Sequence, residues 1–207
     1  MRFIRDLSLG AKIAASFAVV GVASAVAGLG TFATFTSSTS ASNTVASGTV
    51  VIALGATGAS TNRLNINAAD VAAGDTMQRS FDLNNTGSID LSGVTLTTTA
   101  GPSSLLDTDA TNGLQMVIDK CSVAWTEGGS APAYTYTCGG VTTSVLASRA
   151  VIGSTIALAS LASLTAAGTD RLHLTLTLPS GAGNTFQGLS STISYAFTGT
   201  QRTATNK

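Results

Sequence analysis

The sequence predicts an all-β protein: a single antiparallel β-sandwich or jelly-roll domain preceded by a cleaved signal peptide. Strand-like runs rich in Thr and Val recur along the chain, and the clusters of Gly, Asn and Asp between them suit turns. The segment 171–178 alternates strictly, with four leucines on one face and Arg171, His173, Thr175 and Thr177 on the other. We therefore expect one buried and one solvated face there, with the lone His173 at the surface.

The N-terminus has the pattern of a secretory signal peptide, which we assign to residues 1–33. Basic residues come first, an uncharged apolar run follows from 13 to 35, and small residues lie near its end. The small-x-small pattern fits cleavage after Ala25, Ala27 or Ala33, and we take the bond between Ala33 and Thr34. An uncleaved membrane anchor is the alternative, because the run is long enough to span a bilayer.

Residues 34–48 are the expected mature N-terminal segment, and residues 49–207 the expected folded domain. The segment is polar and carries no charge, with Phe35 and Val45 as its only sizeable apolar residues. Such a segment buries little apolar surface by itself. It is therefore either a floppy terminus or a strand that needs a partner.

The folded domain contains eight runs that we expect to be strands. They are residues 49–54, 63–68, 77–85, 91–99, 114–125, 133–138, 170–179 and 191–200. The segment 84–88 (NNTGS) is expected to be a hairpin turn between two of these runs. Residues 143–167 are rich in Ala, Leu and Ser, and their pattern fits helix and strand equally.

Cys121 and Cys138 are the only cysteines, and export to an oxidising exterior favours a disulfide between them. The stretch between them reads as a strand, a Gly/Pro turn and a second strand, so the bond is expected to staple a hairpin. A loop of this length contributes roughly 3 kcal/mol in the chain-entropy model. The alternative is that the two cysteines remain free thiols or take part in redox chemistry.

Composition argues against several kinds of function. Ten basic residues balance ten acidic ones and no basic cluster occurs in the domain, which excludes a nucleic-acid partner. The chain has one His and contains no H-E-x-x-H, no G-x-S-x-G and no Gly-rich phosphate loop. We therefore expect neither catalysis nor a cofactor.

The best acidic cluster is formed by Asp107, Asp109 and Asn112, and it resembles a calcium loop. It misses the EF-hand register, because the third ligand falls one position late and the bidentate Glu is absent. A solvated turn is the simpler interpretation, and a calcium site is the alternative. No other metal site is expected.

Four segments share the pattern of one family. Residues 28–35 (GLGTFATF) are similar to the end of its signal peptides, and residues 43–55 to its N-x-F-A-x-G-T-L-x-L segment, with Val45 at the aromatic position. The pattern across 68–97 is matched by Gly74, Asp75, Phe81, Asn85, Gly87 and Val94. The closing block 184–201 contains N-x-F-Q-G, which includes Gln187 and Gly188. Together these segments resemble the camelysin/TasA family of secreted biofilm-matrix proteins.

The resemblance implies a jelly-roll domain that a dedicated signal peptidase releases to the cell surface or extracellular matrix. In TasA-like fibre proteins the mature N-terminal strand completes the sheet of the next subunit. The resemblance thus assigns residues 34–48, with Thr34, Phe35 and Val45, to a donor strand. It makes a second copy of the chain the main partner, in a head-to-tail polymer, and an accessory fibre protein a further one.

Two other functions stay open. One is a monomeric secreted module, associated with the cell wall or accessory to fibres. The other is a metallopeptidase, because camelysin is described as one in its family. This chain offers no recognisable zinc ligands, so that activity is not expected to carry over.

Overall fold

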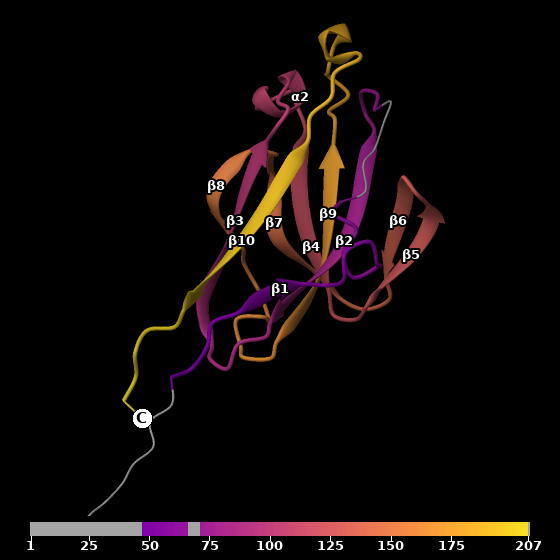
Figure 1. The fold of residues 1–207 in the computed structure, drawn as a ribbon. Coiled ribbons are helices and arrows are strands. Elements are labelled where there is room, and N and C mark those ends of the chain that lie inside the picture. Colours follow the sequence, from indigo (N-terminus) through magenta and orange to yellow (C-terminus); the bar gives the residue numbers. More distant parts are fainter. Residues whose placement is uncertain (1–46, 66–70, 207) are drawn as a thin grey trace, which may run out of the picture. The chain divides into compact units, whose positions relative to one another are not determined.

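The computed structural model describes residues 47–65 and 71–206, and these form an all-β antiparallel sandwich (Figure 1). This confirms the predicted fold class. The larger sheet has the order β1-β2-β9-β4-β7, with β1 at Ile52–Leu54, β2 at Thr76–Asn85, β9 at Thr169–Thr177, β4 at Gln115–Cys121 and β7 at Thr142–Ala150. The smaller sheet has the order β10-β3-β8, with β10 at Ile193–Gln201, β3 at Leu91–Ala100 and β8 at Gly153–Ala157.

The core lies between these two sheets and is built by alternate residues of each strand. Leu172, Leu174, Leu176 and Leu178 are all buried, as their alternation predicts. They pack with side chains from β2, β3 and β4, namely Phe81, Leu83, Val94, Leu96, Met116 and Ile118. The apolar face of each strand therefore fixes which side of its sheet turns inward.

A hairpin forms a third sheet, made of β5 at Trp125–Ser130 and β6 at Ala133–Cys138 (at the right of Figure 1). It packs beside β2, where the Tyr136 N–H donates to Gln78 Oε1 at 3.2 Å. The hairpin covers the face of β9 that we expected to be solvated. His173 is only 8% exposed, so the predicted surface position is wrong. Because β5 and β6 pair with neither sandwich sheet, the jelly-roll arrangement stays a prediction.

The segment 84–88 is not a hairpin turn, contrary to the prediction. The strands that it joins, β2 and β3, belong to different sheets, so this connection carries the chain across the sandwich. Turn residues occur equally in a hairpin turn within one sheet and in a connection between two sheets. Only the pairing partners of the two strands distinguish these cases. The consequence is that the corner lies beside β1 rather than at a hairpin tip.

Three further segments refine the strand assignment. Residue 63 has no regular structure and residues 64–65 form a turn rather than a strand, and the rest of the run 63–68 lies outside the described residues. The run 114–125 is divided, because β4 ends at Cys121 and β5 begins at Trp125. The undecided stretch 143–167 contains strands β7 and β8.

Two short helical turns lie between strands, α2 at Leu105–Thr108 and η1 at Asn184–Phe186. The α2 turn has a reciprocal cap: the Leu106 N–H donates to the Ser104 hydroxyl, and the Ser104 N–H donates to the Asp107 carboxylate. Within the described ranges, no helix is long and apolar enough to cross a membrane.

Candidate functional site

The first described residues are tied to the corner that follows β2. The Val51 carbonyl accepts the N–H groups of Thr86 at 2.9 Å and Gly87 at 3.2 Å. The Thr49 carbonyl accepts the Ser88 N–H at 3.0 Å, and the Thr49 N–H donates to the Ser88 hydroxyl at 2.9 Å. We call residues 49–51 the N-terminal lead. These bonds fix the point at which the chain enters the folded body.

Asn85 and Gly87 give the corner its shape. The Asn85 side chain is buried; its amide donates to the carbonyls of Ile89 at 3.1 Å and Thr165 at 3.3 Å, and its oxygen accepts the Gly87 N–H at 3.0 Å. A Cβ on Gly87 would lie 2.3 Å from the Thr49 carbonyl oxygen. Only glycine lets the lead approach this closely. Both family-motif positions thus hold the N-terminal lead in place.

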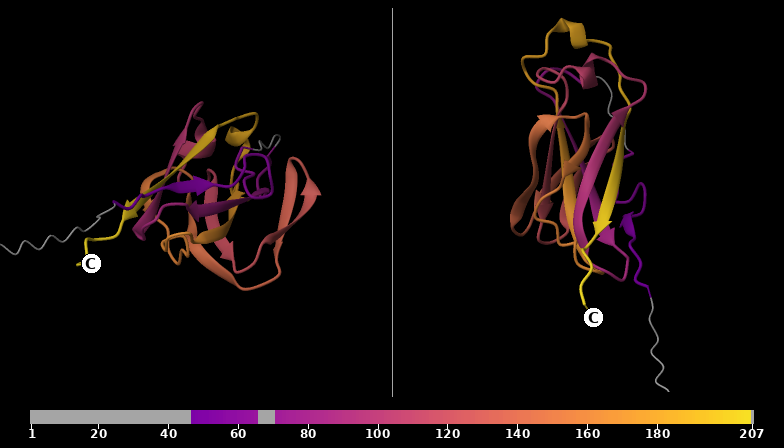
Figure 2. Two further views of the ribbon diagram at one scale, coloured as in Figure 1. Left: turned by 60° about the horizontal axis from the view of Figure 1, so that its bottom comes forward. Right: turned by 90° about the vertical axis from the view of Figure 1, so that its left-hand side faces the viewer.

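The long edge strand β10 lies near the same end of the body. Within 47–65 and 71–206 its one pairing partner is β3, from Ile193 to Gln201. Gly199 approaches Ile52 of β1, since a Cβ placed on it would lie 3.0 Å from Ile52 Cγ2. In the right-hand view of Figure 2, β1 and the chain end after β10 emerge at the same end of the body. The N-terminal lead and the free edge are therefore neighbours.

The backbone direction along β10 follows from its register. The Leu158 N–H donates to the Val94 carbonyl at 3.1 Å, so the backbone N–H and C=O groups of Val94 point toward the β8 side of β3. Neighbouring residues in a strand point to opposite sides, hence Thr95 and Thr97 point toward β10. Their partners are Thr198 and Ala196.

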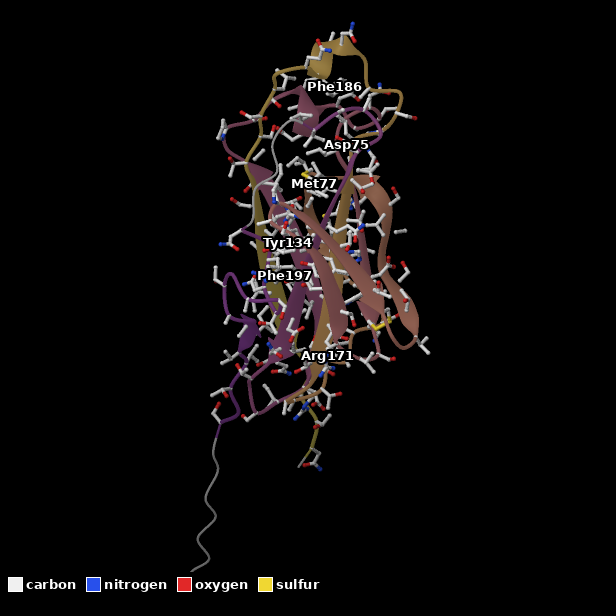
Figure 3. The ribbon with its side chains drawn as sticks, turned by 90° about the vertical axis from the view of Figure 1, so that its right-hand side faces the viewer. Asp75, Met77, Tyr134, Arg171, Phe186 and Phe197 are labelled. Carbon is white, nitrogen blue, oxygen red and sulfur yellow. A yellow bond between two sulfur atoms is a disulfide. The ribbon has the colours of Figure 1, made fainter. Side chains whose placement is uncertain are left out.

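The intervening β10 residues consequently point their backbone groups away from β3. These are Tyr195, Phe197 and Gly199, and no described residue bonds to their N–H or C=O groups. The side chains of Tyr195 and Phe197 turn inward and are partly buried against the core. Phe197 and Tyr134 lie at mid-height of the body in Figure 3, with Phe186 above and Arg171 below. Burial raises the pKa of Tyr195 far above its ordinary value.

The other edges of the described sandwich are shorter or irregular. β1 has three residues, and β8 has five with Thr155 at φ 50°. β7 shows two register shifts against β4 and carries Arg149. Short strands, irregular pairing and charge are the usual protection of an edge against pairing with another chain. β10 has one register shift, at its end between Thr200 and Gln201, and carries no charged residue.

The β5–β6 hairpin encloses His173. Its ring centroid lies 4.7 Å from that of Trp125 and 5.2 Å from that of Tyr136, and Trp125 Nε1 donates to the Arg171 carbonyl at 2.9 Å. His173 Nε2 has no hydrogen-bond partner among the described residues. Burial therefore lowers the pKa of His173 to about 4.

Polar contacts and a disulfide fasten the hairpin to the body. Arg63 forms a two-pronged ion pair with Glu127, at 2.6 and 2.9 Å, and the Tyr136 hydroxyl donates to the same carboxylate at 2.9 Å. The bonds from Arg63 lower the pKa of Glu127, although burial opposes the shift. The predicted disulfide is confirmed: Cys121 at the end of β4 joins Cys138 at the end of β6.

The acidic cluster Asp107, Asp109 and Asn112 forms a turn held by hydrogen bonds. The Asp107 carboxylate accepts the hydroxyls of Ser103 at 2.6 Å and Ser191 at 2.5 Å, in addition to its bond within the α2 cap. Burial would raise the pKa of Asp107, but these hydrogen bonds outweigh it and lower the pKa. Asp109 Oδ1 accepts the N–H groups of Thr111 and Asn112 at 2.9 Å. A cation would have to displace these donors, and calcium binding here stays the untested alternative to the predicted turn.

The remaining family-motif residues lie in turns or in the core. Gly74 has φ +95° and Gly188 φ +68°, which suits glycine in tight turns. The Asp75 carboxylate accepts the Ala72 N–H at 2.8 Å, and the Gln187 N–H donates to the Asn184 carbonyl at 3.1 Å. Phe81 and Val94 are core residues. The expected cleavage bond at Ala33–Thr34 and the donor-strand residues Thr34, Phe35 and Val45 lie outside the described residues.

The described residues do not fit a catalytic metal. No group of three His, Cys, Asp or Glu side chains in 47–65 and 71–206 comes close enough to hold one. The one histidine is enclosed by Trp125 and Tyr136, and both cysteines are in the disulfide. No catalytic step can be derived from these groups.

Sequence reasoning missed the free edge of β10 and the enclosure of His173. The first had a visible signal, because the run 191–200 contains no charge and no proline. The second had none, because alternation assigns residues to two faces but does not reveal what lies on the polar face. Arg63 and Glu127 are 64 residues apart in the sequence. Nothing local connects them.

Comparison with known families gives a match over the first part of the chain. A family described as camelysin metallo-endopeptidase matches residues 8–128, which is more than half of the chain. The match includes the corner with Asn85 and Gly87, the N-terminal lead and the first half of the sandwich. Comparison with curated proteins finds no match.

Proposed function

This chain belongs to the camelysin family, and from that premise we propose that it is a structural subunit of an extracellular fibre or surface appendage. Each subunit donates residues 34–48 to the next, head to tail. The carrying observation is the attachment of the N-terminal lead. Thr49 and Val51 bond to the corner at residues 86–88, and the body Ala46–Lys207 is one compact unit that contains the core of the described residues.

The composition of the donor segment suits this task. Residues 34–46 carry no charge, and their Ser and Thr side chains fit a strand without a charge penalty. An added strand satisfies unpaired backbone groups at a sheet edge. Because a head-to-tail contact does not close on itself, repetition lengthens the polymer.

Export and partners follow from the same proposal. A dedicated signal peptidase releases the chain between Ala33 and Thr34, and a free N-terminal segment then becomes available outside the cell. The main partner is a second copy, and an accessory fibre protein is a further one. We also propose that the chain is not an enzyme, because its single His and disulfide-bonded cysteines leave no set of zinc ligands among the described residues.

The test compares the secreted chain with a variant lacking residues 34–46. The deletion keeps the N-terminal lead, so the corner bonds are left intact. Intact mass first establishes the N-terminus, and sedimentation velocity across a concentration series then measures assembly. Growing polymers in the secreted chain, and a monomer of unchanged thermal stability in the variant, support the proposal. A secreted chain that stays monomeric favours the accessory module instead.

A control variant distinguishes the effect of the donor segment's sequence from the effect of its length. Residues 34–46 are replaced by a Gly/Ser segment of equal length, which is flexible and lacks Phe35 and Val45. Polymerisation of this control at the native rate would show that the segment's sequence is irrelevant. A mass that still includes residues 1–33 would mean a membrane-anchored domain and contradict the free donor strand.

A further inference from the structure

We propose that the outer edge of β10 is the surface that receives the donor segment of a second copy. The inference rests on the proposed function and names the acceptor within the body. The occupant is the donor segment 34–48 of another chain, of which residues 34–46 would extend the three-stranded sheet β10-β3-β8 by one strand.

The backbone of β10 leaves hydrogen-bonding groups available on its outer side. Tyr195, Phe197 and Gly199 point their N–H and C=O groups outward, and no described residue bonds to them. The intervening Ala196 and Thr198 point toward β3. The edge therefore offers donors and acceptors at every second residue, which is the pattern that an incoming strand requires.

The β10 edge lacks the features that protect the other edges. β1 and β8 are short, and β7 is irregular and charged, whereas β10 has nine residues without a charge or a proline. A long, uncharged edge without such protection is a template for pairing with another chain. Among the described edges of the sandwich, β10 alone combines these properties.

The donor segment fits the β10 edge in length and in charge. Nine residues of β10 span about 30 Å at the usual rise of a strand, and thirteen donor residues reach about 43 Å. The donor covers the edge with residues to spare. Neither segment carries a charge, so none is desolvated when they pair. Tyr195 and Phe197 are only partly buried, and an added strand would shield them further.

The location of the edge also defines a competing occupant. The chain leaves the N-terminal lead close to the end of β10, because Ile52, the residue after the lead, approaches Gly199. A donor segment that starts beside the edge of its own body is able to fold back onto that edge as well as to reach a second copy. Hydrogen exchange in the dilute monomer distinguishes these two occupants.

The test is residue-resolved hydrogen exchange of the secreted chain, as dilute monomer and as polymer. We expect the amides of Tyr195, Phe197 and Gly199 to exchange freely in the monomer and to slow by at least about tenfold in the polymer. The amides of Ala196 and Thr198 should be protected in both states. They serve as internal controls, because they already bond to β3.

A second arm uses the variant lacking residues 34–46 and a synthetic peptide of residues 34–48. The peptide should slow exchange at the same three amides, and a peptide of scrambled sequence should not. This arm reports on the edge without polymerisation. It therefore separates a failure of the acceptor from a failure of the fibre.

The outcomes are distinct. Polymers without protection at Tyr195, Phe197 and Gly199 would overturn the acceptor and leave the proposed function standing. Protection already present in the dilute monomer, and lost on deletion of 34–46, would mean that the chain's own segment fills the edge. That result would also overturn the inference. Absence of polymers together with absence of protection by the peptide would contradict both the proposed function and the acceptor edge.

Discussion

Phe81 of β2 and Phe197 of β10 pack with their ring centroids 5.3 Å apart, at an interplanar angle of 42°. One ring belongs to the large sheet and the other to the edge strand of the small sheet. The pair therefore couples the acceptor edge proposed for β10 to the centre of the core. Tilted aromatic pairs of this kind contribute about 0.5–1.5 kcal/mol beyond the burial of their area.

Phe81→Ala is expected to lower the free energy of unfolding by about 3–5 kcal/mol, because the side chain is fully buried. Phe197→Ala should cost less, since that ring is only partly buried. Urea unfolding followed by the fluorescence of Trp125 measures both. Thr198→Ala is the matched control on the exposed face of β10, with an expected change within about 0.5 kcal/mol. Equal losses of unfolding free energy in Phe81→Ala and Phe197→Ala would contradict the partial burial of Phe197 at the edge.

Gly87→Ala is expected to detach the N-terminal lead, because its Cβ would fall 2.3 Å from the Thr49 carbonyl oxygen and 2.8 Å from the Val51 nitrogen. We expect a loss of at least about 1 kcal/mol of stability and faster cleavage near residues 47–51 in limited proteolysis. Gly93→Ala is the control, since nothing lies within 4 Å of its Cβ. Unchanged proteolysis in Gly87→Ala would show that the lead is not held at the corner.

His173 makes stability depend on pH. Because its pKa is about 4 in the folded protein and about 6.5 in the unfolded chain, the unfolded chain binds more protons below pH 6.5. Stability is therefore lost as the pH falls from 6.5 toward 4, by at most about 3 kcal/mol. Asp119 lies opposite His173 in the sheet, and burial raises its pKa, which acts in the other direction at lower pH.

His173→Leu tests this directly. The loss of unfolding free energy between pH 7 and pH 4.5 should become smaller in the variant than in the native chain. Urea unfolding at both pH values measures it, and the imidazole resonances of the native chain give the pKa. An imidazole that titrates near 6.5 would contradict the enclosure by Trp125 and Tyr136.

Cys121→Ser together with Cys138→Ser is expected to lower the free energy of unfolding by about 3 kcal/mol. The loss should concentrate in the hairpin, because the bond ties its second strand to β4. Hydrogen exchange of residues 125–138 should accelerate more than that of β9. Glu127→Gln, which weakens the ion pair to Arg63, should loosen the same hairpin while leaving the disulfide in place. Uniform acceleration across all strands would contradict a local role.

Cleavage of casein is the readout for the peptidase function of the family. We expect none from the purified chain, with or without added zinc, because it has a single His and both cysteines are disulfide-bonded. The chain beginning at Thr34 and the chain lacking residues 34–46 should both leave casein uncleaved. Cleavage that zinc restores after chelation would overturn this expectation.

The sequence predicts the elements that depend on local pattern. Leu172 to Leu178 alternate, so their strand and its buried face follow from the sequence. The disulfide was predictable from the count of two cysteines and from the export that we expect. What the polar face of β9 contacts does not follow, because the hairpin that covers His173 comes from a distant part of the chain. The same holds for the corner at 84–88, whose turn residues do not reveal that its strands lie in different sheets.

In the candidate site, too, local motifs are predictable from the sequence and contacts between distant segments are not. Asn85 and Gly87 are recognisable as a motif, but their contact with Thr49 and Val51 depends on the folded arrangement. The free edge of β10 depends on which strands pair with β3, and sequence alone does not specify that pairing. Edges are properties of a sheet rather than of a strand. They can be read only once the order of strands is known.

The most direct test of the account is electron microscopy of the secreted chain beside the chain lacking residues 34–46, in negative stain at the same high concentration. The account predicts thin, uniform filaments from the secreted chain and single particles from the shortened one. Single particles from both, or filaments from both, would contradict polymerisation by the N-terminal segment.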